Sequence, residues 1–333
     1  MIGDVIEFSA GISPGAHPVG ITTGPDGNVW FTETSAIGRI TPDGEVTEFS
    51  VGITPGSRPI QIAVGSDQNL WFAETQGHAI GRITPDGHVT EFSEGISPKS
   101  RPAGIVAGPD GNLWFTEARG AIGRITPDGE VTEFSDGIRP RSNLLGIDVG
   151  PDGALWFTQQ SEGGGIGRIT LDGEVTVFTD GLRADAMPGG IAAGADGNLW
   201  FTNFGRPNAV SMGLDNFTVG CGIGRITPEG EITEFVDGLG PMARPPSTVP
   251  DGVVAECGPS DIIAGPDGNI WFTEFFGERI TRITPDGTIT EFAAGISPDS
   301  RPDWLAVGPD GNIWFTEPVG NRIGRLELGS RPA

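Results

Sequence analysis

Hydrophobic and polar positions recur along this chain with a long, regular period. A segment with a glycine, an aspartate, an aliphatic residue and then Trp-Phe occurs seven times. Its tryptophans are Trp30, Trp71, Trp114, Trp156, Trp200, Trp271 and Trp314. Successive tryptophans are 41, 43, 42, 44, 71 and 43 residues apart. Such a period indicates a repeat protein in which each unit is one small group of secondary-structure elements.

Each unit has the pattern of four short β-strands. In the unit from 102 to 134, the apolar runs cover 104–107, 113–116, 121–125 and 131–134. Pro-Asp-Gly sequences separate the first run from the second and the third from the fourth. They favour tight turns, because proline presets φ and glycine accepts a positive φ. Short strands at this spacing predict an all-β array.

The repeat predicts a ring. A single four-stranded sheet leaves two apolar faces in water, so seven units are expected to pack into a closed seven-bladed β-propeller. The last unit ends after its third strand, at 323–326, while 4–9 have the pattern of a missing fourth strand. We therefore expect the N-terminal strand to complete the last blade and hide both edges, in a single domain spanning 1–333. A linear solenoid is the alternative, but it leaves that strand without a partner.

The one long spacing contains two insertions, which cover 204–222 and 236–258. In an antiparallel blade both fall on the face opposite the Pro-Asp-Gly turns, so we expect them together over one end of the central funnel. Long loops in a compact domain are often functional. Met187, Met212 and Met242 lie in loops of this face. They either line an adaptable apolar pocket or pack the insertions onto their own blade.

Cys221 and Cys257, the two cysteines of the chain, lie near the C-terminal ends of the insertions. A disulfide between them is open from the sequence. The N-terminus has neither a basic segment nor an apolar leader segment, which favours a cytoplasmic protein with free thiols.

The charge balance narrows the range of partners. The chain has 20 Lys and Arg against 44 Asp and Glu, a net charge of −24. Such a surface repels phosphate backbones and anionic lipids, so we expect neither nucleic acid nor a membrane as partner. No phosphate-binding loop or Cys-x-x-Cys pair appears. We expect a small-molecule ligand, no organic cofactor and a monomer.

The innermost strand departs from its own pattern in the last two units. Its first position reads Val19, Ile60, Ala103, Leu145, Gly189, Ser260 and Asp303. Its next position reads Gly20, Gln61, Gly104, Gly146, Gly190, Asp261 and Trp304. Polar and aromatic groups therefore gather at the funnel mouth in these two units, beside the insertions. Departures from a regular repeat are candidate functional sites, although Asp303 could simply pair with Arg301.

The second strand ends at the same rim, mostly in an acidic residue. The seven positions hold Glu33, Glu74, Glu117, Gln159, Asn203, Glu274 and Glu317. Unpaired carboxylates around one opening would repel one another, so one interpretation is a structural ring paired with arginines. The arginines of the connecting loops are Arg58, Arg101, Arg244 and Arg301. The other interpretation is a Mg²⁺ site held by Glu274 and Glu317 and flanked by Asp303, because Mg²⁺ takes one or two carboxylates plus water.

Repeated Trp-Phe-Thr-Glu followed by Ile-Gly-Arg-Ile-Thr, as in 114–117 and 122–126, resembles the virginiamycin B lyase (streptogramin lyase) family. The resemblance covers nearly the whole chain, apart from the two insertions. It implies a seven-bladed propeller that opens a cyclic depsipeptide lactone by Mg²⁺-assisted elimination rather than by hydrolysis.

The resemblance also implies where the chemistry lies. The family's catalytic histidines follow a proline at the start of the innermost strand in the last two blades, and the matching residues here are Ser260 and Asp303. The family's glutamate before the second of these prolines is matched by Arg301, and its first-blade tyrosine by Val19. The glutamate that ends the second strand of the last blade is retained as Glu317.

We consider three functions. The first is a lyase-like enzyme that performs acid–base elimination or cyclisation on a small, largely apolar, secondary-metabolite-like substrate. Asp303 would transfer the proton, and Glu317 and Glu274 would bind metal or position the substrate. The expected substrate contacts are Trp304, Ser260, Asp261, Asn203, Phe275, Phe276, Met212 and Met242. The second is a non-catalytic propeller that binds a small molecule, peptide or protein on its acidic face. The third is a metal-dependent lactonase-type hydrolase.

Overall fold

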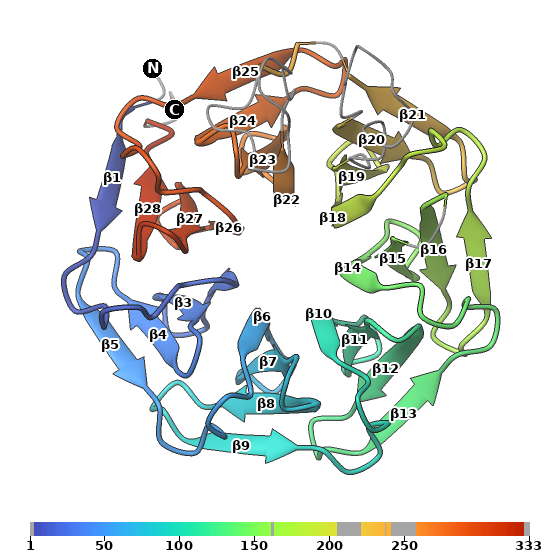
Figure 1. The fold of residues 1–333 in the computed structure, drawn as a ribbon, viewed down its shortest axis with the longest axis horizontal. Helices are drawn as coiled ribbons and strands as arrows, with labels where there is room; N and C mark the ends of the chain where they lie inside the picture. Colours follow the sequence, from blue (N-terminus) through green and yellow to red (C-terminus); the bar gives the residue numbers. More distant parts are fainter. Residues whose placement is uncertain (1–2, 161–162, 205–220, 237, 241–257, 330–333) are drawn as a thin grey trace, which may run out of the picture.

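The short apolar runs form seven four-stranded antiparallel sheets in the computed structural model, arranged around a common axis as a seven-bladed β-propeller (Figure 1). The structure describes residues 3–160, 163–204, 221–236, 238–240 and 258–329. Within these ranges it contains no helix long and apolar enough to cross a membrane. Each blade runs from an innermost strand beside the axis to an outermost strand at the perimeter.

The strands of blades one to four follow the chain in order. Blade one contains β2 (Ile21–Thr23), β3 (Val29–Thr32), β4 (Ile37–Ile40) and β5 (Val46–Phe49). Blade two contains β6 (Pro59–Val64), β7 (Leu70–Glu74), β8 (Ala79–Ile83) and β9 (Val89–Phe92). Blade three contains β10 (Pro102–Ala107), β11 (Leu113–Glu117), β12 (Ala121–Ile125) and β13 (Val131–Phe134). Blade four contains β14 (Leu144–Val149), β15 (Leu155–Gln159), β16 (Gly165–Ile169) and β17 (Val175–Phe178).

Blades five and six have the same order, and blade seven combines both ends of the chain. Blade five contains β18 (Pro188–Ala193), β19 (Leu199–Asn203), β20 (Gly222–Ile226) and β21 (Ile232–Phe235). Blade six contains β22 (Pro259–Ala264), β23 (Ile270–Glu274), β24 (Arg279–Ile283) and β25 (Ile289–Phe292). Blade seven contains β26 (Leu305–Val307), β27 (Ile313–Glu317), β28 (Arg322–Leu326) and β1 (Val5–Phe8).

The N-terminal strand closes the ring, as the sequence predicts. β1 pairs antiparallel with β28, with Val5 opposite Leu326 and Phe8 opposite Ile323. The ring of Phe8 stacks on that of Trp314, with centroids 5.5 Å apart. The strand therefore covers the edge of β28 and completes the apolar core of blade seven.

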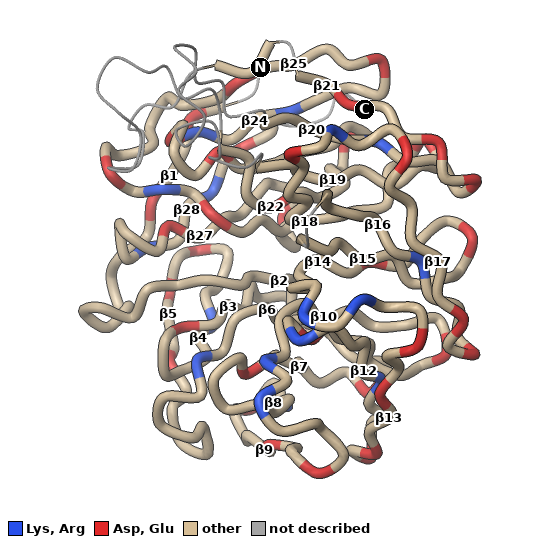
Figure 2. Tube along the Cα trace, turned by 45° about the vertical axis from the view of Figure 1, so that its right-hand side comes forward, with Lys and Arg blue, Asp and Glu red and all other residues tan. Residues whose placement is uncertain are grey.

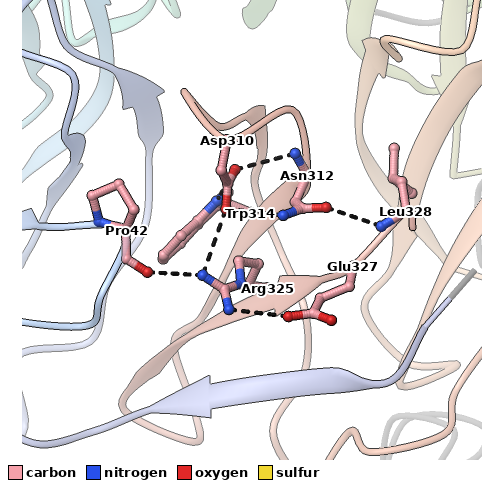
Figure 3. A network of polar contacts seen from close by, with 7 residues as sticks. All are labelled: Pro42, Asp310, Asn312, Trp314, Arg325, Glu327 and Leu328. Carbon is pink, nitrogen blue, oxygen red and sulfur yellow. Dashed lines mark hydrogen bonds and ion pairs between the residues drawn. The ribbon is translucent and has the colours of Figure 1, made fainter. Parts of the chain in front are cut away.

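The Pro-Asp-Gly turn before the second strand is tied to the rest of its blade by a hydrogen bond and an ion pair. In blade seven, Asp310 accepts a hydrogen bond from Trp314 Nε1 at 3.0 Å and lies 3.5 Å from Arg325 (Figure 3). Arg325 stacks over the Trp314 ring and donates to the carbonyl oxygen of Pro42 in blade one at 2.8 Å. The same network of turn, tryptophan and arginine therefore joins one blade to the next.

Acidic residues lie all around the ring, in the turns as well as at the outer strands (Figure 2). Among the described residues, no group of three or more His, Cys, Asp or Glu side chains is arranged to hold a metal ion. The acidic composition is therefore a property of the whole ring, without a described cluster of acidic ligands.

Candidate functional site

The innermost strands bring the predicted site residues to the axis through an irregularity in strand pairing. In blade six, Pro259 lies opposite Glu274 and Ile262 opposite Phe272, so the register shifts between them and Ser260 and Asp261 fall in the shift. Blades two to five have the same shift. A bulge of this kind redirects side chains, and here it places two polar ones at the funnel mouth.

Threonines of the second strands hold this backbone in place. Thr202 donates to the Ser260 carbonyl at 2.8 Å, and Thr273 donates to the Asp303 carbonyl at 2.5 Å. Each also accepts a backbone hydrogen bond within its own blade, as Thr273 does from Asp261 N–H at 3.1 Å. Blade two has the buried Ala73 at this position. Hydrogen bonds between neighbouring blades therefore hold the backbone of the innermost strands at the funnel mouth.

The mouth contains a cavity of about 110 Å³. Its wall is mainly apolar, with Ile60, Leu145, Phe204 and Trp304, and Ser260 and Asp261 are polar residues on its blade-six side. Trp304 and Asp261 also line the wider channel of about 380 Å³ that continues along the axis. These two side chains therefore lie where the mouth cavity meets the channel. A small, largely apolar group fits such a wall.

Ser260 and Asp303 form a pair across blades six and seven. The Ser260 hydroxyl donates to Asp303 Oδ1 at 2.5 Å. Burial raises the pKa of Asp303 to about 6, even though the hydrogen bond from Ser260 acts in the opposite direction. Among the described residues, Asp303 makes no ion pair within 4.0 Å. Arg301 instead stacks on the rings of Phe275 and Phe276, 5.4 Å from each centroid.

Asp261 lines the cavity and also bonds to the neighbouring blade. Its Oδ2 accepts from the backbone N–H of Leu305 in blade seven at 3.0 Å. Gln61 occupies the same repeat position in blade two, and its Oε1 accepts from Ile105 N–H in blade three, also at 3.0 Å. Burial raises the pKa of Asp261 to about 7, with Asp303 and Asp148 adding to the shift and backbone hydrogen bonds opposing it. A polar side chain here links neighbouring blades.

The glutamates that end the second strands do not surround the funnel. All seven side chains at this position are at most 5% exposed. Glu33, Glu74 and Glu117 interact with outer-strand glutamates of their own blades, namely Glu48, Glu91 and Glu133. Burial, together with these neighbouring carboxyl groups, raises the pKa of Glu33 and Glu74 to about 8 and that of Glu117 to about 9.

Glu274 and Glu317 are paired with arginine instead of with each other. Arg279 Nη2 lies 3.0 Å from Glu274, and Arg322 Nε lies 3.2 Å from Glu317. Each glutamate thus contacts an arginine of its own blade, and the shared Mg²⁺ site that the sequence suggested stays a prediction. Burial raises the pKa of both, and Arg279 and Arg322 oppose that shift. For Glu317 the result is still about 8, because Glu7 also raises it.

These arginines are not the ones expected from the connecting loops. They occupy the first position of β24 and β28. The other five blades have alanine or glycine there, at Ala36, Ala79, Ala121, Gly165 and Gly222. This difference is visible in the sequence, as an alanine or glycine that becomes arginine in the last two blades, but the partners of the glutamates were expected among the arginines of the connecting loops.

Three further expected substrate contacts lie away from the cavity wall. Asn203 is fully buried, accepts from Met187 N–H at 2.8 Å and donates to Glu234 at 2.7 Å. Phe275 and Phe276 pack edge to face, with centroids 5.0 Å apart, and contact Arg301. Phe204, at the repeat position equivalent to Phe275, lines the cavity instead.

Most of both insertions lies outside the described residues, including Met212 and Met242. Cys221, at the end of the first insertion, is buried and disulfide-bonded, which corrects the expectation of a free thiol. Cys257, the other cysteine of the sequence, lies outside the described residues.

Comparison with known proteins places this site in context. The model of the virginiamycin B lyase family matches residues 5–251 and 223–331. A structure of a streptogramin B lyase has 34% sequence identity and a TM-score of 0.79, with 98% of this chain and 97% of that one covered.

A catalytically inactive histidine-to-alanine variant of virginiamycin B lyase from Staphylococcus aureus, determined with quinupristin, is 34% identical, with a TM-score of 0.79 and coverage of 98% and 99%. A putative gluconolactonase, at 18% identity and a TM-score of 0.52 over 82% of this chain and 88% of that one, shares the propeller fold alone. The comparison with curated proteins finds no match.

Proposed function

Because the chain belongs to the virginiamycin B lyase family, we propose that it is a lyase-like enzyme acting on a small, largely apolar molecule at the funnel mouth. The observation that carries this proposal is the hydrogen bond of 2.5 Å between Ser260 and Asp303. The two residues occupy the positions that the sequence resemblance assigns to the family's catalytic histidines. Asp303 is not among the residues that line the apolar cavity, but its partner Ser260 is, so a proton acceptor lies one hydrogen bond behind the cavity wall.

Asp303 is the group assigned to take the proton. In an elimination, a base removes a proton from a carbon next to a carbonyl group, and the bond from the neighbouring carbon to the leaving oxygen breaks. With a pKa raised to about 6, the Asp303 carboxylate is mostly ionised at neutral pH and more basic than an ordinary aspartate. Ser260 holds the carboxylate in one orientation, and Trp304 and Phe204 supply the apolar wall.

The resemblance also implies Mg²⁺, and we tested whether the retained glutamate suits it. Glu317 is fully buried and lies 3.2 Å from Arg322. Glu274 is fully buried and lies 3.0 Å from Arg279. Two carboxylates that each face an arginine in separate blades do not fit a shared metal. The proton transfer is therefore assigned to the side chains of the chain itself.

The test uses quinupristin as probe, because a variant of a related lyase was determined with it. The wild-type protein and the Asp303→Asn variant are incubated with the probe, with and without EDTA. The masses of the products are then measured by mass spectrometry. Elimination opens the ring without changing the mass, whereas hydrolysis adds one water, so the experiment separates a lyase from a lactonase. We expect a ring-opened isomer from the wild type only. An unchanged rate in Asp303→Asn would overturn the assignment.

Two further variants make this test specific. Ser260→Ala should lower kcat and shift the pH profile, because it removes the hydrogen bond that opposes the raised pKa of Asp303. Glu33→Gln changes a buried carboxyl group in blade one, outside the mouth cavity, and should leave the rate unchanged. For the wild type, the rate should fall as the pH drops through about 6, because Asp303 becomes protonated there.

A second candidate is a propeller that binds a small molecule without turning it over. It is favoured by the ion pairs that hold Glu274 and Glu317 away from the mouth, because they leave Asp303 as the one assigned proton-transfer group. This candidate predicts that quinupristin raises the melting temperature while its mass spectrum and chromatographic position stay unchanged. Trp304→Ala should then weaken the shift, because it removes much of the apolar wall.

A further inference from the structure

Another cavity lies at the rim of blade three, away from the funnel mouth and the central channel. Its volume is about 520 Å³, and its wall includes Glu117, Ala121 and Glu133. Lys99 and Arg119 also line it, and both side chains are exposed, so the cavity opens to solvent at their edge. We call it the blade-three acid pocket, after its two carboxyl groups.

Blade six contains the same two carboxyl positions with an arginine between them. Arg279 Nη2 lies 3.0 Å from Glu274, and Arg279 Nε lies 3.4 Å from Glu291. Blade seven repeats this arrangement. Arg322 lies 3.2 Å from Glu317 and 2.7 Å from Glu7 of β1. The chain therefore uses a guanidinium group twice to bridge the carboxyl groups of the second and outermost strands.

Ala121 occupies the position of these arginines in blade three. It lies opposite Glu117 in the strand register, as Arg279 lies opposite Glu274 and Arg322 opposite Glu317. The methyl group of alanine ends where the guanidinium-bearing side chain of the other blades continues. The pocket therefore has the anionic partners of a guanidinium group but lacks the group itself.

One oxygen of Glu117, Oε1, is left without a donor among the described residues, although the carboxyl group also interacts with Glu133. Its side chain is 1% exposed, it lines the pocket, and no group of the described chain donates a hydrogen bond to Oε1. Glu133 is held from the other side, because its two oxygens accept from the N–H and the hydroxyl of Ser97, each at 2.5 Å. A buried carboxyl oxygen without a donor is costly, and a bound cation with N–H groups would supply one.

We propose that the blade-three acid pocket binds the guanidinium group of a small cationic ligand, bridged by Glu117 and Glu133. A guanidinium is preferred over an ammonium because its planar fork of donors matches two carboxylates at once. Lys99 and Arg119 face the open edge and weaken the attraction of the pocket for a cation, but both are exposed to solvent and screened by salt.

Binding is coupled to a proton. Burial and the neighbouring Glu133 raise the pKa of Glu117 to about 9, so the unliganded pocket holds a proton at neutral pH. A guanidinium group favours the ionised carboxylate and lowers this pKa, as Arg322 acts on Glu317 in blade seven. Binding therefore releases protons and becomes tighter as the pH rises from 7 towards 9.

The test is isothermal titration calorimetry of the full chain with methylguanidinium. Tetramethylammonium is the control, because it has the same charge but no N–H donors. We expect millimolar binding of methylguanidinium at pH 8.5, weaker binding at pH 7, and none of tetramethylammonium. Proton release is measured by repeating the titration in buffers with different heats of ionisation. Equal binding of both ions, or no binding of methylguanidinium, would overturn the proposal.

Three variants locate the site. Ala121→Arg places an arginine of the chain in the pocket, so it should abolish binding and raise the melting temperature. Glu117→Gln should weaken binding at least tenfold and remove its pH dependence, and the natural Gln159 at the same position of blade four indicates that the blade accepts this change. Glu130→Gln removes one exposed charge from the same blade and should bind as the wild type does. An equal loss of affinity in the Glu130→Gln and Glu117→Gln variants would show that the cation is attracted only by the overall negative charge of the surface, which would contradict the proposal.

Discussion

Blades one to three and blades six and seven each place a buried glutamate of the second strand beside a less buried glutamate of the outermost strand, but they compensate this pair differently. In blade three every influence on Glu117 raises its pKa, and the pair relies on a proton. In blades six and seven an arginine lies between the two carboxyl groups and opposes the effect of burial. The same pair of carboxyl groups is therefore compensated either by a bound proton or by an arginine side chain of the same blade.

This comparison shows that the pH response of a repeat protein is set blade by blade. Replacing alanine by arginine at one strand position changes the compensation without changing the strand register. A buried carboxyl group with a raised pKa stabilises the native state fully below about 4.5, and this contribution is lost as the pH rises through the raised value. Glu33, Glu74 and Glu117 therefore make blades one to three sensitive to alkaline pH, and Glu317 in blade seven, whose pKa is about 8, adds to this response.

The largest effect should come from removing the outer strand of blade seven. Deletion of residues 1–10 takes away Glu7, one carboxylate bridged by Arg322, and Phe8, which stacks on Trp314. It also exposes the edge of β28. We expect the melting temperature to fall by about 10 °C or more, measured by circular dichroism. Deletion of residues 1–3 is the control, and a stable 1–10 deletion would contradict strand closure.

The next effect should come from Arg322→Ala, which turns the blade-seven arrangement into that of blades one to three. Removing one partner of a buried ion pair costs about 3 kcal/mol, and we expect this loss at pH 8 in urea unfolding. The loss should be smaller at pH 6, because Glu317 and Glu7 can then share a proton. Arg119→Ala, at an exposed arginine, should change little. A pH-independent loss would argue against proton sharing.

A smaller effect is expected from neutralising blades one to three together. The triple variant Glu33→Gln, Glu74→Gln and Glu117→Gln removes three groups whose folded pKa values are about 8 to 9. The wild type should lose stability between about pH 4.5 and 9, by at most about 1.4 kcal/mol per pH unit for each group. The variant should show a flatter profile in urea unfolding across this range. Parallel profiles would show that these glutamates are not protonated in the fold.

The smallest effect should come from Ala79→Arg in blade two. Ala79 lies opposite Glu74 as Arg279 lies opposite Glu274, with connecting segments of equal length. An added arginine should stabilise the fold by about 1 kcal/mol at pH 9 and have no effect at pH 5, where Glu74 is protonated. Ala79→Gln serves as the uncharged control. A gain that is equal at both pH values would point to packing instead of charge.

The sequence was sufficient for the fold but only partly for the site. The period of the tryptophans, the Pro-Asp-Gly turns and the orphan strand at 4–9 predicted the seven blades and their closure, because each depends on local pattern and strand counting. The repeat pattern placed Ser260 and Asp303 together at the funnel mouth, but their hydrogen bond was not predicted, since Arg301 was the partner considered for Asp303. The orientation of Glu274 and Glu317 was not predicted, because the two residues were placed by where their strands end and not by the strand face that their side chains occupy.

Strand alternation explains that error. Successive side chains in a strand point to opposite faces. Thr273 and Thr316 use one face to bond the innermost strands, so the glutamate that follows each of them points to the other. Asp261 shows a second limit of prediction from the sequence, which concerns contacts between blades. Its bond to Leu305 N–H depends on the distance between two blades, which no pattern within one repeat contains.

The closing strand also has a consequence for synthesis on the ribosome. β1 is synthesised well before its partner β28, because most of the ring lies between Val5 and Leu326 in the sequence. At about 5–20 residues per second, β1 waits tens of seconds without its partner. During this time its backbone and the ring of Phe8 are open to a chaperone or to another nascent chain. The order of translation therefore leaves this four-residue strand without its partner until β28 has been made.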